Sequence, residues 1–229
     1  MKQVLIILAS LDKETCRRCV NGGGLDEFTI PYYLFRKAGY AVFVAAPHCA
    51  GRTLDLELLR GNAPEYLQEC WKDGFDPALA RLFPLESVAD WQFDAVFYPG
   101  GRCCCPGERL AADPGNTRLL GRMLDSGKVV GAVSYGPAAL LGGTRCDGHP
   151  LVFRRGVTGL SNAEEDANPE DSSSVRFRLE DRLKSAGAHY LSREPWLSHV
   201  VVDGNLVTGQ NPDSAAAVGE AMIHLLEHG

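Results

Sequence analysis

The sequence predicts an α/β domain with a mainly parallel sheet and helices on both of its faces. Short apolar runs rich in β-branched or aromatic residues recur along the chain, and each is continuous rather than alternating, which is typical of strands buried on both faces. Stretches with helical spacing separate them, and this alternation implies right-handed crossovers between parallel strands. The predicted strands are residues 4–8, 41–46, 95–98, 129–133 and 200–202.

The intervening helices are predicted from apolar residues at helical spacing. Three of them end before Gly39, Gly127 and Gly187, because glycine favours the position after a helix C-terminus, and a fourth begins near Ser214. Residues 54–85 hold short helical patterns but no strong strand, so we expect an inserted cap over one sheet edge. No linker-like composition divides the chain, and we expect one domain over residues 1–229.

Charge and composition limit the classes of partner that the chain can bind. The chain has 23 Lys and Arg against 29 Asp and Glu, a formal charge of -6, which argues against binding to nucleic acid or to anionic membranes. The first apolar run is too short for a signal peptide, and no run could span a bilayer. We therefore expect a cytoplasmic protein whose partner is a small molecule, and whose eight cysteines are reduced rather than paired in disulfides.

The strand at 129–133 runs into a tight turn at Ser134, Tyr135 and Gly136 and then into a helical stretch. A nucleophile elbow has this order: its side chain stands above the carboxyl edge of the sheet, and backbone N–H groups of the next helix can stabilise an oxyanion. A serine also needs a base, and none is adjacent in sequence. An ordinary strand-to-helix turn remains the alternative.

A second turn follows the strand at 95–98. Its paired glycines, Gly100 and Gly101, permit close approach of the backbone to a ligand or a neighbouring loop. With Arg102 and Gly136 they form our predicted substrate-binding set, although a plain tight turn would explain the two glycines equally well.

Two groups of cysteines follow the first and third predicted strands and should emerge at the same sheet edge. Three or four thiolates there could hold a zinc ion, and the neighbouring arginines would favour thiolate over thiol. A redox pair or unconnected thiols are the alternatives, because adjacent cysteines diverge. The predicted metal ligands are Cys16, Cys19, Cys103 and Cys105.

Two acidic features belong to the same edge. Glu27 opens the first predicted helix, where a carboxylate is electrostatically favoured. Glu164 and Glu165 follow the run at 158–162. On residue type alone, each is more often a helix-start charge or a solvated side chain than a catalyst.

Five segments, in this order, carry a resemblance to a known family. Together they resemble the ThiJ/PfpI superfamily, within the class I glutamine-amidotransferase-like fold, and in particular its heat-inducible chaperone/glyoxalase branch. The resemblance implies a flavodoxin-like sandwich, a homodimer and no required cofactor, and its better-known members are glutathione-independent glyoxalases, deglycases, chaperones or peptidases. The segments are 25–27 with 31–33, 93–101, 132–140, 157–165 and 207–212.

The resemblance also implies roles for individual residues. Glu27 matches the carboxylate of the first helix, and Glu165 matches the acid of the triad. The elbow, however, has Ser134 where the family has cysteine and Tyr135 where it has histidine. Arg102 follows the glycine pair in place of histidine, so the usual glyoxalase chemistry is not expected.

Two functions stay open. In the first, the chain is an enzyme acting on a small carbonyl or acyl compound, a lyase or hydrolase whose thiol has moved to Cys103, Cys104 or their neighbour, or whose site is assisted by zinc. Glu27 and Glu165 would then be acid/base groups and Tyr135 a proton donor. In the second, the chain is a non-catalytic, chaperone-like, ligand-sensing or metal/thiol-sensing protein; a dimeric scaffold with incidental cysteines is a third reading.

Overall fold

A seven-stranded sheet forms the centre of the computed structural model, which describes residues 1–9, 26–47, 81–100, 104–167 and 177–229. The strand order is β3-β2-β1-β4-β5-β9-β8, and every neighbouring pair is parallel except β8 with β9. This confirms the predicted α/β class. The strands are β1 (Gln3–Ile7), β2 (Ala41–Ala46), β3 (Leu82–Pro84), β4 (Ala95–Tyr98), β5 (Val129–Val133), β8 (Val200–Asp203) and β9 (Leu206–Gly209).

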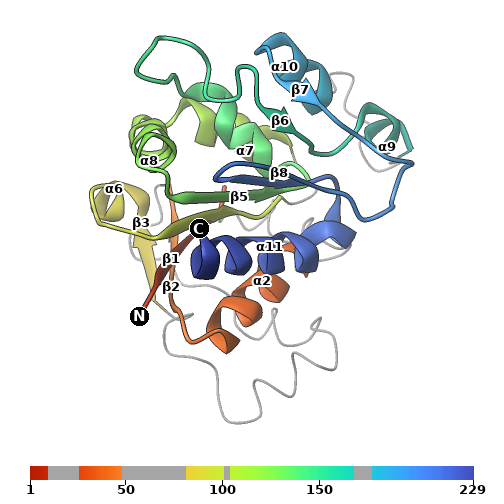
Figure 1. Cartoon of the computed structure of the whole chain (residues 1–229). Coiled ribbons are helices and arrows are strands. Elements are labelled where there is room, and N and C mark those ends of the chain that lie inside the picture. Colours follow the sequence, from red (N-terminus) through yellow and green to blue (C-terminus); the bar gives the residue numbers. More distant parts are fainter. Residues whose placement is uncertain (10–25, 48–80, 101–103, 168–176) are drawn as a thin grey trace.

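Helices cover both faces of this sheet (Figure 1). On one face, α2 (Asp26–Lys37) and α11 (Ala215–His228) pack against each other and share a core with β1, β2 and β5. On the other, the elements that pack against the sheet are α6 (Leu85–Val88), α7 (Cys104–Ala112), α8 (Pro114–Asp125) and the short helix η1 (Gly136–Gly142). The sheet is thus buried on both sides, as the continuous apolar runs predicted.

The ends of the helices follow local sequence signals. Helix α8 begins at Pro114 after Asp113, whose side chain accepts the Asn116 backbone N–H at 2.9 Å, an arrangement typical of a helix N-terminus. Beyond the ends of α2 and α8, Gly39 and Gly127 have φ of 80° and 70°, values that glycine adopts without strain. These two of the three predicted helix stops are confirmed, and Gly187, the third, likewise has a positive φ, of 83°.

A smaller layer lies beyond η1 on the same side of the sheet (Figure 1). It contains the two-stranded parallel sheet of β6 (Gly156–Val157) and β7 (His189–Tyr190), with α9 (Asn162–Ala167) and α10 (Leu179–Ser185). Leu179 and Leu183 of α10 are fully buried in the same core cluster as η1. This layer therefore belongs to the main core, next to the carboxyl edge of β5.

The edge of the sheet differs from the prediction. Residues 200–202 were expected as a strand buried on both faces, but they belong to β8, an antiparallel edge strand that pairs with β9. Val202 is accordingly half exposed. Strand β9 was missed as a strand, because its four residues closely follow β8 and a turn at Gly204, where φ is 56°.

The inserted cap predicted at residues 54–85 lies outside the described residues up to position 80, and the part that follows differs from the prediction. Residues 82–84, at the end of the segment 54–85, form the short edge strand β3. Three residues ending in proline are too few to show a periodic pattern. In the described part of the chain, no helix is long and apolar enough to cross a membrane.

Candidate functional site

The turn after β5 has the geometry of a nucleophile elbow. Ser134 has φ of 57°, a left-handed conformation that costs a residue other than glycine roughly 1–2 kcal/mol. Hydrogen bonds hold its main chain on both sides: the Ser134 N–H donates to the Gly209 carbonyl at 2.9 Å, and the Leu160 N–H donates to the Ser134 carbonyl at 3.0 Å. Strain that is maintained in this way is typical of functional sites.

Glu27 and Ser134 converge on the backbone of Gly100. Both side chains are buried, Glu27 in the first turn of α2 and Ser134 at the end of β5. A methyl group at Gly100 would collide with Glu27 Oε2, and it would lie 2.7 Å from Ser134 Cβ and 2.6 Å from the Val133 carbonyl. Only glycine fits here, so the turn after β4 lets the carboxylate of α2 approach the elbow.

A small pocket opens beside this point. Its described walls enclose about 10 Å³, room for roughly one water molecule. Two tyrosines, Tyr98 and Tyr135, line it together with small and apolar residues, so the pocket would favour a compact, uncharged group. Its described lining is Ala9, Tyr98, Pro99, Gly100, Leu110, Tyr135, Gly136 and Ala139.

The helix after the elbow is fixed by a buried pair that sequence reasoning missed. The Tyr98 hydroxyl donates to Asn116 Oδ1 at 2.7 Å, and Asn116 Nδ2 donates to the Ala139 carbonyl at 3.2 Å. Burial raises the pKa of Tyr98 well above its usual value, so the phenol stays protonated and remains a donor. No sequence signal marks Asn116, which reads as a residue in the first turn of α8.

Gly136 allows this helix to approach β4. A Cβ at Gly136 would collide with the Tyr98 carbonyl oxygen and lie 3.4 Å from the Pro99 carbonyl carbon. The role that we predicted for Gly136 in binding substrate stays a prediction, but its place in the pocket wall is compatible with it.

Glu165 belongs to α9, and its carboxylate holds the start of α10. Its Oε2 accepts the Arg178 N–H at 3.1 Å and its Oε1 accepts the Leu179 N–H at 2.9 Å. The preceding Phe177 packs edge-on against Tyr135, with ring centroids 6.5 Å apart. Glu165 thus holds the main chain that follows Phe177, and the acid/base role implied by the resemblance stays a prediction.

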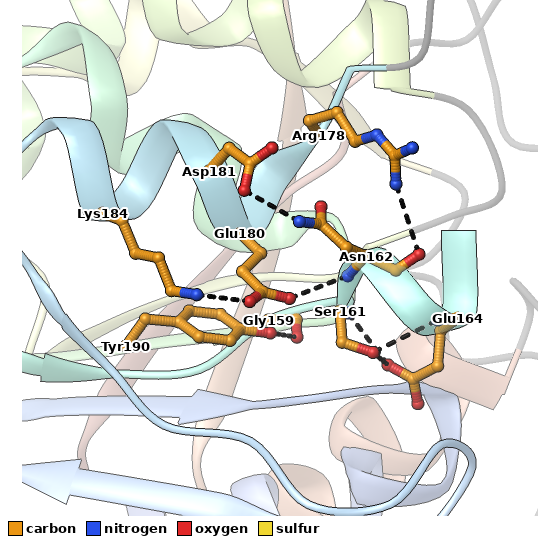
Figure 2. Close-up of polar contacts among 9 residues, drawn as sticks. All are labelled: Gly159, Ser161, Asn162, Glu164, Arg178, Glu180, Asp181, Lys184 and Tyr190. Carbon is orange, nitrogen blue, oxygen red and sulfur yellow. Dashed lines mark hydrogen bonds and ion pairs between the residues drawn. The ribbon is translucent and has the colours of Figure 1, made fainter. Parts of the chain in front are cut away.

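Glu164, the neighbouring acid, is fully buried and binds Ser161 at 2.8 Å through the serine hydroxyl. Figure 2 shows this contact together with the polar contacts that join α9 to α10. There, the Asn162 N–H donates to Glu180 Oε2 and Asn162 Nδ2 donates to Asp181 Oδ1, both at 2.8 Å. Asn162, the first residue of α9, is therefore bonded to α10, and Ser161, the residue before it, is bonded to Glu164.

A second carboxylate pair lies at the start of α2. Burial, followed by the negative charge of Asp213, raises the pKa of Asp26, and Asp213 belongs to the short helix η2 (Pro212–Ser214). Asp26 directly precedes Glu27, so the first turn of α2, which supplies the carboxylate at the elbow, carries two acidic residues.

The cysteine and arginine predictions fall mostly outside the described residues. Helix α7 begins at Cys104 and continues through Cys105, which brings the main chain of both residues to the carboxyl side of β4. In the ranges that the structure describes, no three His, Cys, Asp or Glu side chains are grouped as a metal site. The residues that lie outside are Cys16, Cys19, Gly101, Arg102 and Cys103, and the side chains of Cys104 and Cys105.

Fold and site together define a flavodoxin-like α/β protein with an elbow at the carboxyl edge of its sheet. The chain belongs to the DJ-1/PfpI family, whose model matches residues 21–225. This confirms the resemblance found in the sequence.

Curated relatives cover most of the chain. It is 32% identical over 224 residues to "Glutamine amidotransferase-like class 1 domain-containing protein 1" of Xenopus laevis, covering 90% of this chain and 95% of the relative. It is 30% identical over 207 residues to "Glutathione-independent glyoxalase HSP31" of Saccharomyces cerevisiae, covering 86% of each.

Solved structures show the same fold. The crystal structure of glyoxalase III from Candida albicans matches with a TM-score of 0.76 at 23% identity, covering 98% of this chain and 97% of that one. Rapid Encystment Protein 24 KDa of Francisella tularensis matches with a TM-score of 0.80 at 25% identity and covers 99% of each chain.

Proposed function

We propose that this chain is an enzyme that acts on a small carbonyl or acyl compound bound next to the elbow. The observation that carries the proposal is the convergence of Glu27 and the strained Ser134 on Gly100. A backbone strained by roughly 1–3 kcal/mol persists only where its surroundings enforce it, and the buried carboxylate beside it is positioned to serve as an acid/base group. Relatives with glyoxalase names, at about 30% identity, support a carbonyl substrate.

The reacting thiol in this proposal comes from the run of three cysteines at residues 103–105. Serine is a poor nucleophile without a base, and Ser134 has replaced the family's cysteine in our interpretation of the elbow. A thiolate of Cys103 or Cys104 adds to the carbonyl carbon, the carbon–oxygen π bond opens, and the oxygen takes a proton from Tyr135 or protonated Glu27. A hemithioacetal or its acyl counterpart is the product of this step.

A thiolate-bound zinc ion is the other form of the same proposal. Cys16, Cys19, Cys103 and Cys105 would be its ligands, and the ion would polarise the carbonyl oxygen. Their residue types suit zinc, and the strands that precede them in sequence, β1 and β4, are parallel neighbours that end at the same edge of the sheet.

Turnover of a substrate panel tests the proposal. The purified chain is assayed with small aldehydes, 2-oxoaldehydes, esters and amides, and then with Glu27→Gln and with each of the three clustered cysteines changed to alanine. We expect measurable turnover that falls at least about a hundredfold in Glu27→Gln and in one cysteine variant. Cys146→Ala is the matched control, because Cys146 is exposed on a surface loop, and unchanged rates in all cluster variants would contradict the proposal.

The alternative is a non-catalytic ligand- or thiol-sensing protein. Both oxygens of Glu165 accept backbone N–H groups, and Tyr135 packs on Phe177. Both side chains therefore have structural roles that need no catalysis, which favours this alternative. Compounds of the same panel that raise the melting temperature without being converted would support this alternative. The homodimer implied by the family also stays a proposal, which sedimentation of the purified chain tests.

A further inference from the structure

Glu164 is a buried carboxylate for which the proposed chemistry has no use. It is fully buried at the start of α9, and a charge taken out of water is stable only where hydrogen bonds replace its hydration. Here its Oε2 accepts the backbone N–H of Ser161 at 2.9 Å and the Ser161 hydroxyl at 2.8 Å. Figure 2 shows Glu164 pointing back towards Ser161.

The other oxygen of Glu164 reaches two different segments. Its Oε1 accepts from the Trp196 N–H at 2.8 Å, from Gln210 Nε2 at 3.2 Å and from Asn211 Nδ2 at 2.9 Å. Gln210 and Asn211 follow β9, whereas Trp196 belongs to the segment between β7 and β8. One carboxylate therefore joins three stretches of chain that are far apart in sequence.

Two of these stretches are the ones that hold the elbow. The main chain of Ser134 is bonded to Leu160 and to Gly209. Ser161 follows Leu160 directly, and Gln210 follows Gly209 directly. Glu164 therefore joins the two stretches one residue beyond their contacts with Ser134, and the Ser134 main chain lies between them.

We propose that Glu164 is a positioning residue that keeps Ser134 in its left-handed conformation by tying together the two segments that flank the elbow. The functional importance of this role rests on the proposed function, but the role itself concerns only the main-chain geometry of the elbow. Its test needs no turnover, so its failure is distinguishable from the failure of the proposed enzyme.

Glutamine at position 164 would break this arrangement although its size is nearly the same. All five groups on the carboxylate are donors, and an amide offers one acceptor oxygen and one donor NH₂. The NH₂ group would replace one of the two carboxylate oxygens. In one orientation it would face the two donors that now bond to Oε2, and in the other it would face the three donors that now bond to Oε1. The tie to one of the two flanking segments is then lost, and the elbow is free to open locally.

Hydrogen–deuterium exchange measures this opening. In Glu164→Gln we expect the amides of Ser134 and Leu160 to exchange about tenfold faster, while amides of β1 exchange as in the parent. The matched control is Glu180→Gln, which also removes a carboxylate that accepts a backbone N–H at the start of α9, that of Asn162 at 2.8 Å, but does not join this segment to the one after β9. Both amides should exchange there at the parent rate.

A thiol at position 134 gives a second measurement. In the Ser134→Cys variant, the rate of alkylation at position 134 is compared by peptide mass spectrometry with the rate at Cys146, which is exposed. Adding Glu164→Gln should change this ratio severalfold, and adding Glu180→Gln should not. A loss of overall stability would also speed amide exchange in β1, which distinguishes it from a local opening at the elbow.

Ser161→Ala is the milder variant if Glu164→Gln does not fold, since it removes only the hydroxyl from the carboxylate. It should speed exchange at Leu160 more than in β1. Parent-like exchange at Ser134 and Leu160 in the folded variant, or exchange that rises equally throughout the chain, would overturn the proposed role.

Discussion

Replacing Glu165 with glutamine should destabilise the fold by about 2 kcal/mol. The carboxylate is buried, and its oxygens accept the N–H groups of Arg178 and Leu179 at 3.1 and 2.9 Å. The amide keeps one acceptor and turns its NH₂ towards the other N–H group. A hydrogen bond to a charged group contributes about 1.5–3 kcal/mol, and for a chain of this length the loss lowers the melting temperature by roughly 4–8 °C.

Urea unfolding of Glu165→Gln beside the parent measures this loss, and Asp166→Asn is the control. Asp166 is the next residue on α9, but its ion pair with Arg178 at 3.0 Å is half exposed, so its removal should cost less than about 0.5 kcal/mol. If Glu165→Gln were as stable as the control, the two backbone contacts would contribute little, and the assignment of Glu165 to holding α10 would be refuted.

Three further predictions concern other parts of the site. Tyr98→Phe should lower the unfolding free energy by about 1–3 kcal/mol, because Asn116 Oδ1 would lose the only donor that the described residues give it; urea unfolding measures the loss, and a value near zero would contradict it. The pKa of Asp26 is raised in the folded state, so the folded state binds this proton more tightly, and the contribution of Asp26 to stability falls as pH rises above the unfolded pKa of about 4. When unfolding is measured between pH 4 and 7, this fall should be smaller in Asp213→Asn than in the parent. An identical fall would show that burial alone raises the pKa. Replacing the four proposed cysteine ligands with serine should remove about one zinc per chain from protein purified without chelator, as elemental analysis would show; parent protein without metal would exclude the zinc form of the proposal.

The sequence was sufficient for the sheet interior and for the elbow, because both leave short-range signals. Continuous runs such as 129–133 are typical of strands buried on both faces, and a following Ser-Tyr-Gly turn is where a strand gives way to a helix. Its helix stops were likewise visible, since Gly39 and Gly127 stand where a positive φ is needed.

Sequence could not provide the parts that depend on contacts between distant residues. Asn116 bonds to Tyr98 and to Ala139, and nothing in its own neighbourhood marks it as buried. Glu164 and Glu165 looked alike as helix-start charges, yet one joins the segments around the elbow and the other holds α10. Only the fold brings their partners together.

The edge of the sheet was misjudged for a different reason. Residues 200–202 are all valine, and an all-apolar run does not distinguish a central strand from an edge strand. The antiparallel pairing with β9 is set by the turn at Gly204, which was not interpreted as a hairpin.

Catalysis at the elbow is tested most simply by measuring turnover of small 2-oxoaldehydes and esters by the parent, Glu27→Gln and Asp26→Asn. Both variants remove one carboxylate from the first turn of α2, but only Glu27 reaches the elbow at Gly100. We expect kcat to fall at least about a hundredfold in Glu27→Gln and to stay near the parent value in Asp26→Asn. Equal rates in the parent and Glu27→Gln, or no turnover of any compound by the parent, would contradict it.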